Sequence, residues 1–136
     1  MKHRRSPLRL TQCLLGLAVL AVSGCGGDSG GTGGPDSATV AYSITASPDL
    51  GLDSVKYDNG SGTLVKENSP GNGWIKSQSF RLPGSVEGIL FIHATSPGSV
   101  TFRVLWTIDG ATSGDSATVQ LNGAGFTTLP LPHHSL

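Results

Sequence analysis

Hydrophobic and polar residues alternate along several short stretches in the second part of the chain. In the clearest stretch, 100–108, apolar side chains from Val100 to Ile108 take every second position, with Thr101 and Arg103 between them and Leu105 as the only break. A period of two is typical of a strand that is buried on one face. From Ser37 onward no stretch shows an apolar stripe at helical spacing. The pattern predicts an all-β domain.

The rest of the domain is predicted in the same way, from stretches rich in Val, Ile, Thr, Tyr and Phe. Turn residues such as "NG" at 59–60 and "DG" at 109–110 separate these stretches. Seven or eight short strands predict an immunoglobulin-like β-sandwich over residues 38–132, with a small β-barrel as the alternative and residues 133–136 as a C-terminal tail. We expect strands at 38–47, 53–58, 63–68, 74–82, 86–95, 100–108, 115–121 and 126–131.

The N-terminal residues show a different pattern, in which basic residues are followed by an apolar run. Four basic residues precede the continuously apolar run "CLLGLAVLAV" at 13–22, and the small residues Ser23 and Gly24 follow it. This order is typical of a secretory signal peptide. A membrane span needs roughly 20 apolar residues, so the run is short for a transmembrane helix, which remains the alternative.

The four residues Val22-Ser23-Gly24-Cys25 resemble the lipobox of bacterial lipoproteins. The resemblance implies that residues 1–24 are a signal peptide that is removed and that the Cys25 sulfur receives a diacylglyceryl group. Two or three acyl chains hold a protein firmly in a membrane, so Cys25 would be an anchor for a membrane partner. The alternative is ordinary signal cleavage that leaves Cys25 as a free thiol.

Residues 25–37 are expected to be the lipidated cysteine and a flexible linker. The segment "GGDSGGTGGPDS" at 26–37 has six glycines and no apolar side chain, so it cannot pack into a core. As a flexible coil it would reach about 20 Å. Lipoproteins with aspartate after the cysteine tend to stay on the inner membrane, and Gly26 stands there instead. The expected location is therefore the cell envelope, and the outer membrane if the cell has two.

Charge and cysteine content narrow the class of protein. The chain is neutral overall, but from Cys25 onward it has five basic and nine acidic residues, 5 − 9 = −4. This argues against a nucleic-acid partner, which requires a basic patch. The two cysteines are Cys13 and Cys25, so the domain has neither a disulfide framework nor a cysteine-ligated zinc site. We expect no cofactor.

Residues that could carry catalysis are few. No serine lies in a Gly-x-Ser-x-Gly elbow. His93 is flanked by Ile92 and Ala94, and we expect it to be a packed or edge-facing residue. A sugar hydrolase needs two converging carboxylates, and the acidic residues near strand ends and turns are Glu67, Glu87, Asp109 and Asp115. We expect no catalytic residue, hence no enzyme.

The sequence signals for a metal or ligand site are as weak as those for a catalytic site. Oxygen ligands in a glycine-rich segment can hold Ca²⁺, but such residues are also ordinary in turns, and the spacing does not match an EF-hand. His133 and His134 are expected in a solvated tail, and Trp74 and Trp106 in the core rather than against a sugar. The candidate calcium ligands are Asp49, Asp53, Asp58 and Asn59.

The order of features between about 40 and 130 resembles the soluble domain of the MmpS membrane proteins of mycobacteria. The matching pieces are "SVKYDNGSG" at 54–62, Trp74, "RLPGSV" at 81–86 and "TFRVLWTIDG" at 101–110. The resemblance implies an immunoglobulin-like sandwich that works beside a lipid-exporting transporter. That family carries a cysteine pair in its C-terminal strands and a transmembrane helix, whereas this chain has no cysteine after Cys25.

These observations together predict a lipid-anchored, non-catalytic β-sandwich lipoprotein of the cell envelope that acts as a binding or structural module. An accessory subunit of an envelope transporter of the MmpL or RND type is the alternative, and an envelope protein is then the partner. A third hypothesis, an envelope hydrolase, requires an exposed cleft with two acidic groups or a histidine–hydroxyl pair.

Overall fold

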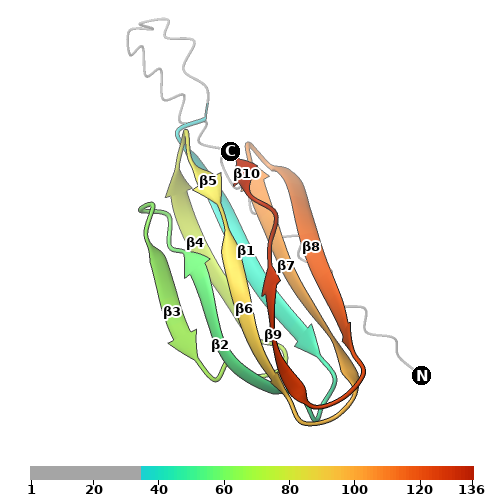
Figure 1. Cartoon of the computed structure of the whole chain (residues 1–136). Coiled ribbons are helices and arrows are strands. Elements are labelled where there is room, and N and C mark those ends of the chain that lie inside the picture. Colours follow the sequence, from blue (N-terminus) through green and yellow to red (C-terminus); the bar gives the residue numbers. More distant parts are fainter. Residues whose placement is uncertain (1–34) are drawn as a thin grey trace, which may run out of the picture. The chain divides into compact units, whose positions relative to one another are not determined.

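The computed structural model describes residues 35–136, which form strands joined by turns and loops (Figure 1). The predicted signal peptide, Cys25 and most of the linker lie outside these residues. Within residues 35–136 no helix is long and apolar enough to cross a membrane. The strands are β1 (Ser37–Ala46), β2 (Gly51–Asp58), β3 (Leu64–Asn68), β4 (Ile75–Arg81), β5 (Ser85–Val86), β6 (Gly88–Ala94), β7 (Gly98–Ile108), β8 (Ala111–Leu121), β9 (Gly125–Pro130) and β10 (His134–Ser135).

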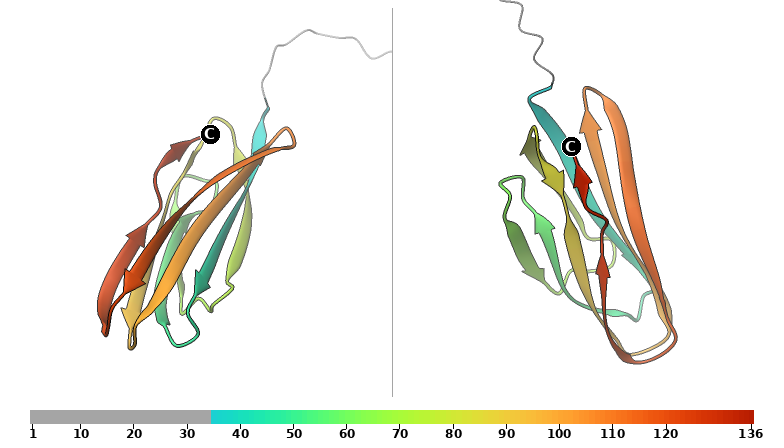
Figure 2. Two further views of the ribbon diagram at one scale, coloured as in Figure 1. Left: turned by 90° about the vertical axis from the view of Figure 1, so that its right-hand side faces the viewer. Right: turned by 45° about the horizontal axis from the view of Figure 1, so that its top comes forward.

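The strands form two four-stranded sheets and one short pair. The first sheet has the order β4-β1-β7-β8, the second has the order β3-β2-β6-β9, and β10 pairs with β5. The strand pairings are antiparallel. The two sheets lie face to face (Figures 1 and 2). This confirms the predicted all-β sandwich, and the described residues do not close into a barrel.

The core lies between the two sheets and follows the alternation seen in the sequence. On β7, Val100, Phe102 and Val104 are fully buried, whereas Arg103 is exposed. The strand β6 is central in its sheet, between β2 and β9, as its largely apolar sequence predicts. Its inner face is buried, and its outer face carries the half-buried Ile89 and Phe91 and the exposed His93. The buried side chains of the core are Ala38, Val40, Tyr42, Ile44, Ala46, Leu50, Leu52, Val55, Tyr57, Phe80, Val86, Leu90, Ile92, Ala94, Val100, Phe102, Val104, Leu129 and Leu131.

The loops gather at the two ends of the sandwich. We call the end where β1 begins the near end; the β2–β3 turn, the β4–β5 connection, the β7–β8 turn and β10 lie there (Figure 1). We call the opposite end the far end; it carries the loops 47–50, 69–74, 95–97 and 122–124. The linker therefore joins the domain at the near end.

Most strand boundaries lie within two residues of the predicted ones, and two differences are larger. The hairpin β7–β8 turns at Asp109 and Gly110, as the "DG" pair predicts: the two residues adopt φ of 49° and 79° and form a two-residue turn. The strand β8 therefore begins at Ala111, four residues before the expected start at 115. The expected strand 86–95 is divided at Glu87 into β5 and β6.

The last residues differ from the solvated tail expected at 133–136. His134 pairs with Val86, and the Leu136 N–H donates a hydrogen bond of 2.8 Å to the Gly84 carbonyl. Leu136 is also half-buried against the core. The apolar Leu131 and Leu136 thus hold this segment at the near end, and its backbone groups find partners in β5.

Candidate functional site

The outer face of the β3-β2-β6-β9 sheet exposes aromatic side chains. Phe126 on β9 is 79% exposed, the largest exposed fraction of any large apolar residue described. Its ring stacks on that of His93, its cross-strand partner on β6, with centroids 4.2 Å apart and planes at 10°. The Lys56 Nζ lies 5.6 Å from the centroid of the half-buried Phe91 ring nearby. One face of Phe126 is thus covered by an aromatic partner, and the side chain is held outward.

A shallow hollow of about 380 Å³ adjoins Phe126 on this outer face. Its lining combines the rings of Phe91 and Phe126 with the polar residues Asp53, Thr127 and Thr128. An apolar surface with a few polar groups at its rim is the usual composition of a small binding site. We call this hollow and its lining the Phe126 hollow.

Asp53 reaches the Phe126 hollow because β2 is bulged there. Leu52 pairs with Ile92 and Ser54 with Phe91, so Asp53 is the extra residue of the bulge. The Ser54 hydroxyl donates a hydrogen bond of 3.2 Å to the Asp53 carboxylate. Bulges of this kind redirect a side chain, and here the carboxylate joins the aromatic lining.

A second polar cluster lies at the edge of the sandwich where β3 and β4 meet. The Glu67 carboxylate accepts hydrogen bonds from the Tyr57 hydroxyl at 2.6 Å, the Trp74 Nε1 at 2.9 Å and the Lys76 Nζ at 2.6 Å. These contacts lower the pKa of Glu67 from 4.5 to about 2, with the Lys76 hydrogen bond as the largest cause. Because β3 and β4 belong to different sheets, this Glu67 cluster joins the two layers.

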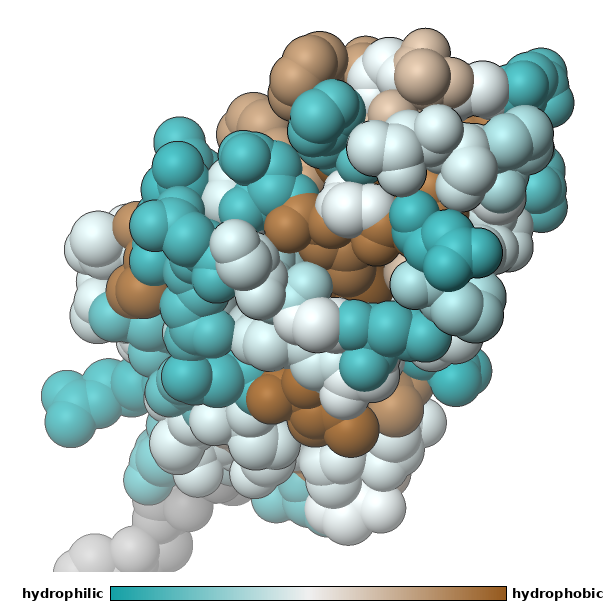
Figure 3. All heavy atoms as spheres, turned by 90° about the horizontal axis from the view of Figure 1, so that it is seen from below, coloured by the Kyte–Doolittle hydropathy of each residue, from teal (hydrophilic) through white to brown (hydrophobic). Residues whose placement is uncertain are grey.

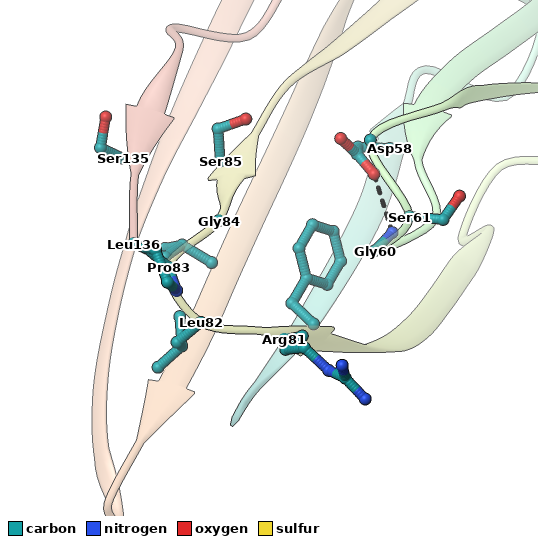
Figure 4. Close-up of a pocket in the computed structure, with 12 residues that line it drawn as sticks. Asp58, Gly60, Ser61, Arg81, Leu82, Pro83, Gly84, Ser85, Ser135 and Leu136 are labelled. Carbon is teal, nitrogen blue, oxygen red and sulfur yellow. Dashed lines mark hydrogen bonds between the residues drawn. The ribbon is translucent and has the colours of Figure 1, made fainter. Parts of the chain in front are cut away.

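A hollow with a volume of about 640 Å³ lies at the near end (Figure 4). Hydroxyl groups of Ser61, Ser85 and Ser135 line it, together with Asp58 and several apolar residues. The Asp58 carboxylate accepts a hydrogen bond of 2.8 Å from the Gly60 N–H. Figure 4 shows the Arg81 side chain directed away from Ser85 and Ser135, so its guanidinium does not converge with these hydroxyls.

A third polar contact joins the C-terminal segment to the β7–β8 hairpin. The His134 Nε2 lies 3.0 Å from the Asp115 carboxylate, and the His134 ring lies 4.9 Å from that of Trp106. The Ser116 backbone N–H and then His134 lower the pKa of Asp115. His134 therefore has a partner in the fold, in contrast to the solvated position expected for it.

The four candidate calcium ligands do not converge. Asp49 lies in the loop before β2 at the far end, whereas Asp58 and Asn59 follow β2 at the near end. Asp53 lies between them on the bulge. The Asn59 carboxamide oxygen accepts hydrogen bonds from the Ser61 N–H and hydroxyl, and it thereby shapes the turn. These residues are turn and bulge residues in the fold, and they do not form one oxygen cage.

The candidate acidic pair of a hydrolase is also dispersed. Glu67 lies on β3, Asp115 on β8 at the opposite edge of the molecule, and Asp109 in the β7–β8 turn. Glu87 is exposed between β5 and β6. Four carboxylates on four separate elements do not give the close pair that glycoside hydrolysis requires.

The aromatic and histidine candidates take clearer positions. Trp74 and Trp106 are both half-buried and packed against the core. His93 lies exposed on the outer face of the central strand β6, where Phe126 covers its ring. Sequence reasoning did not find the Phe126 hollow or the Glu67 cluster, because both depend on which strands are neighbours. A period-two pattern places Phe126 on a face but does not say that His93 lies opposite.

The chain matches no known protein family, no curated protein and no solved structure in three separate comparisons.

Proposed function

We propose that this protein is a lipid-anchored β-sandwich of the bacterial cell envelope that binds another envelope component. The lipobox-like residues Val22 to Cys25 support the anchor, and the glycine-rich segment that follows them in the sequence leads to β1, which begins at the near end of the domain. The exposed Phe126 is the observation that carries the binding role. Large aromatic rings are enriched in contact sites and depleted from surfaces that remain solvated.

The far end of the sandwich is the part that this arrangement presents away from the lipid. Ile75 begins β4 there, and Phe126 lies close to the start of β9. Both are mainly exposed, at 69% and 79%. Seen from below, this end has apolar patches set among polar side chains (Figure 3). A partner that approaches from the far end therefore meets apolar surface next to the Phe126 hollow.

The intact mass of the mature protein from a bacterial host tests the anchor. The expected result is a chain that begins at Cys25 and carries two or three acyl chains, and a Cys25→Ala variant that carries none. A mature protein that retains residues 1–24, or that lacks acyl chains, would contradict the proposed anchor. Neither of these outcomes would bear on the binding role of the domain, which the next experiment tests.

Photo-crosslinking tests the binding role separately. A photoreactive amino acid in place of Phe126 is expected to yield a defined crosslinked product in the envelope of living cells. The matched control is the same substitution at Leu64, an exposed apolar residue at the near end of the domain. Crosslinks of equal yield from both positions would indicate non-specific contact and would contradict the assignment to the Phe126 hollow.

A further inference from the structure

The four edge strands of the two sheets are protected to very different degrees. An unprotected edge invites pairing with another strand, and proteins block it with short strands, lysines, prolines or bulges. The edge strand β3 has five residues and carries Lys66. The edge strand β9 has six residues and ends at Pro130, and β4 carries Lys76 and Arg81. Three of the four edges thus have such devices.

The strand β8 has fewer of them: its one charged residue is Asp115, whose carboxylate is bonded within the chain to the Ser116 N–H at 2.6 Å and to the His134 ring at 3.0 Å. It extends over 11 residues, "ATSGDSATVQL", without lysine, arginine or proline. Its pairing with β7 continues without a bulge from Ala111 to Leu121. Among residues 35–136, β7 is the only strand that pairs with β8. Figures 1 and 2 show β8 along the open side of its sheet, with no other strand beside it there.

The register of the hairpin shows which backbone groups point to the open side. Across a two-residue turn, Ile108 and Ala111 form the first hydrogen-bonded pair, and hydrogen-bonded pairs then alternate with non-hydrogen-bonded pairs. The residues in non-hydrogen-bonded pairs direct their N–H and C=O groups away from β7. All of them are exposed, and they are Thr112, Gly114, Ser116, Thr118 and Gln120.

This row of backbone groups is complementary to a second copy of itself. In an antiparallel pair centred on Ser116, Ser116 lies opposite Ser116, Gly114 opposite Thr118 and Thr112 opposite Gln120. Within one chain the Ser116 N–H donates a hydrogen bond of 2.6 Å to the Asp115 carboxylate. In the pair it exchanges this bond for the Ser116 carbonyl of the second copy, and every outward N–H and C=O of the row then has a backbone partner. In this register even-numbered residues lie opposite even-numbered residues and odd-numbered opposite odd-numbered. The core-facing side chains of both copies therefore lie on the same face of the joined sheet.

The side chains of β8 suit this pairing as well. The single charged residue, Asp115, lies opposite Ala117 in this register and is held by His134 at 3.0 Å, so the two carboxylates do not face each other directly. On the same face, Ala117, Val119 and Leu121 are only partly buried against the core. A second copy of β8 alongside would cover part of this apolar surface.

We propose that two copies of this chain associate through antiparallel β8–β8 pairing, which joins their four-stranded sheets into one eight-stranded sheet. The occupant of the β8 edge is thus a second copy of the same strand, in the register centred on Ser116. The inference does not depend on the lipid anchor or on the Phe126 hollow.

Sedimentation velocity of the full chain in detergent tests the proposal with two variants. Ser116→Pro removes the central outward N–H, and with it the hydrogen bond to the Asp115 carboxylate, but none of the β7–β8 hydrogen bonds. Proline is tolerated in an edge strand at a position whose N–H points away from the neighbouring strand. The wild type and the matched control Ser116→Ala, which keeps the N–H, are expected to be dimers, and Ser116→Pro a monomer. A wild type that is monomeric at every concentration measured would overturn the proposal, as would a dimeric Ser116→Pro variant.

Disulfide crosslinking tests the register even if Ser116→Pro fails to fold. In a Cys13→Ser, Cys25→Ser background, Ser116→Cys is expected to form a covalent dimer on mild oxidation, because opposed residues of a hydrogen-bonded pair have Cα atoms about 5.5 Å apart. Thr112→Cys and Gln120→Cys are expected to link when mixed but not alone. The control is Ser77→Cys on the opposite edge strand. Equal crosslinking of Ser77→Cys and Ser116→Cys, or none at Ser116→Cys, would contradict β8–β8 pairing.

Discussion

At the scale of single residues, the Glu67 carboxylate has the most contacts of any charged group described. Its three donors come from Tyr57 on β2, Trp74 in the β3–β4 loop and Lys76 on β4. Hydrogen bonds to an ionised group are stronger than those between neutral groups. The cluster therefore stabilises the contact between the edges of the two sheets through the charge of Glu67.

A Glu67→Gln variant is expected to be less stable than the wild type by about 1–2 kcal/mol at pH 7, because the hydrogen bonds of the cluster lose their charged acceptor. The folded pKa of Glu67, about 2, lies below its ordinary value of 4.5. The stabilisation from Glu67 is therefore complete above pH 4.5 and is lost as the pH falls toward 2. Urea unfolding of both proteins across this range checks the prediction. Parallel stability curves for the two proteins in this pH range would contradict it.

Tyr42 and Tyr57 are neighbouring buried tyrosines that differ in whether the hydroxyl group has a hydrogen-bond partner. The Tyr42 hydroxyl is buried and has no hydrogen-bond partner within residues 35–136, whereas the Tyr57 hydroxyl donates to Glu67. Burial, and next the nearby Asp58 carboxylate, raise the pKa of Tyr42. The rings themselves pack together with centroids 5.4 Å apart.

We expect Tyr42→Phe to leave the stability unchanged or to raise it by up to about 1 kcal/mol, because it removes an unsatisfied polar group. Tyr57→Phe is expected to lower the stability by about 1 kcal/mol, because it removes a hydrogen bond to a carboxylate. Chemical unfolding midpoints at neutral pH measure both. A larger loss in Tyr42→Phe than in Tyr57→Phe would show that the Tyr42 hydroxyl has a partner such as a bound water.

At the scale of elements, the two sheets approach closely where β6 faces β7. A Cβ on Gly88, the first residue of β6, would lie 2.9 Å from the Phe102 Cε1 and 3.3 Å from the Leu131 Cδ1. Phe102 is fully buried on the opposite sheet, so its ring has little room to move. The absence of a side chain at Gly88 sets how closely the layers pack.

Gly88→Ala is therefore expected to cost about 1–3 kcal/mol, the usual cost of overpacking a core. The matched control is Gly123→Ala in the β8–β9 loop, where an added Cβ meets nothing within 4 Å and the effect is expected to be small. Thermal unfolding followed by circular dichroism compares the two. Equal shifts of the midpoint in both variants would contradict close packing at Gly88.

Most strands could be predicted from the sequence, since each depends on its own alternation and on the turn residues beside it. The interruption of 86–95 at Glu87 could not, because β5 turns to pair with β10, which is a contact between distant segments. The early start of β8 was missed because Ala111, Thr112 and Ser113 show no apolar alternation, and the pairing with β7 decides their conformation.

The candidate site was less accessible to sequence reasoning than the fold. The acidic residues near β2 suggested a metal cage, but a strand separates Asp49 from Asp58 and carries them to opposite ends. The Phe126–His93 stack depends on the register of β6 against β9, which the sequence does not state. Alternation predicts which side chains share a face, whereas topology decides which of them meet.

At the scale of the whole molecule, the near end and the far end differ in their distance from the linker. The β2–β3 turn with Ser61 lies at the near end, and the β8–β9 loop with Gly123 lies at the far end. The strand β6 spans the domain between them, because Gly88 pairs with Tyr57 at the near end and Ala94 with Gly125 at the far end. At about 3.3 Å per residue, these seven residues separate the two ends by roughly 20 Å along the strands.

A fluorescent label therefore reports which end is closer to the lipid in the acylated protein. With Cys25 acylated and Cys13 removed with the signal peptide, Ser61→Cys and Gly123→Cys each offer one reactive thiol. We expect energy transfer to acceptor lipids in vesicles to be more efficient from Ser61→Cys than from Gly123→Cys. Equal transfer from both sites would contradict the proposed orientation, in which the near end faces the lipid.

The central place of β1 has a consequence for how the chain acquires its structure. The first strand in the sequence lies between β4 and β7, and its pairing with β7 brings Thr39 next to Thr107. Loop-closure entropy makes such distant pairings slow to form. A chain that leaves a translocation channel N-terminus first therefore cannot complete its first sheet until almost all of it has emerged. If the expected signal peptide directs the chain through such a channel, β1 lacks its β7 partner until residues 98–108 have emerged, so the sandwich closes only when most of the domain is across.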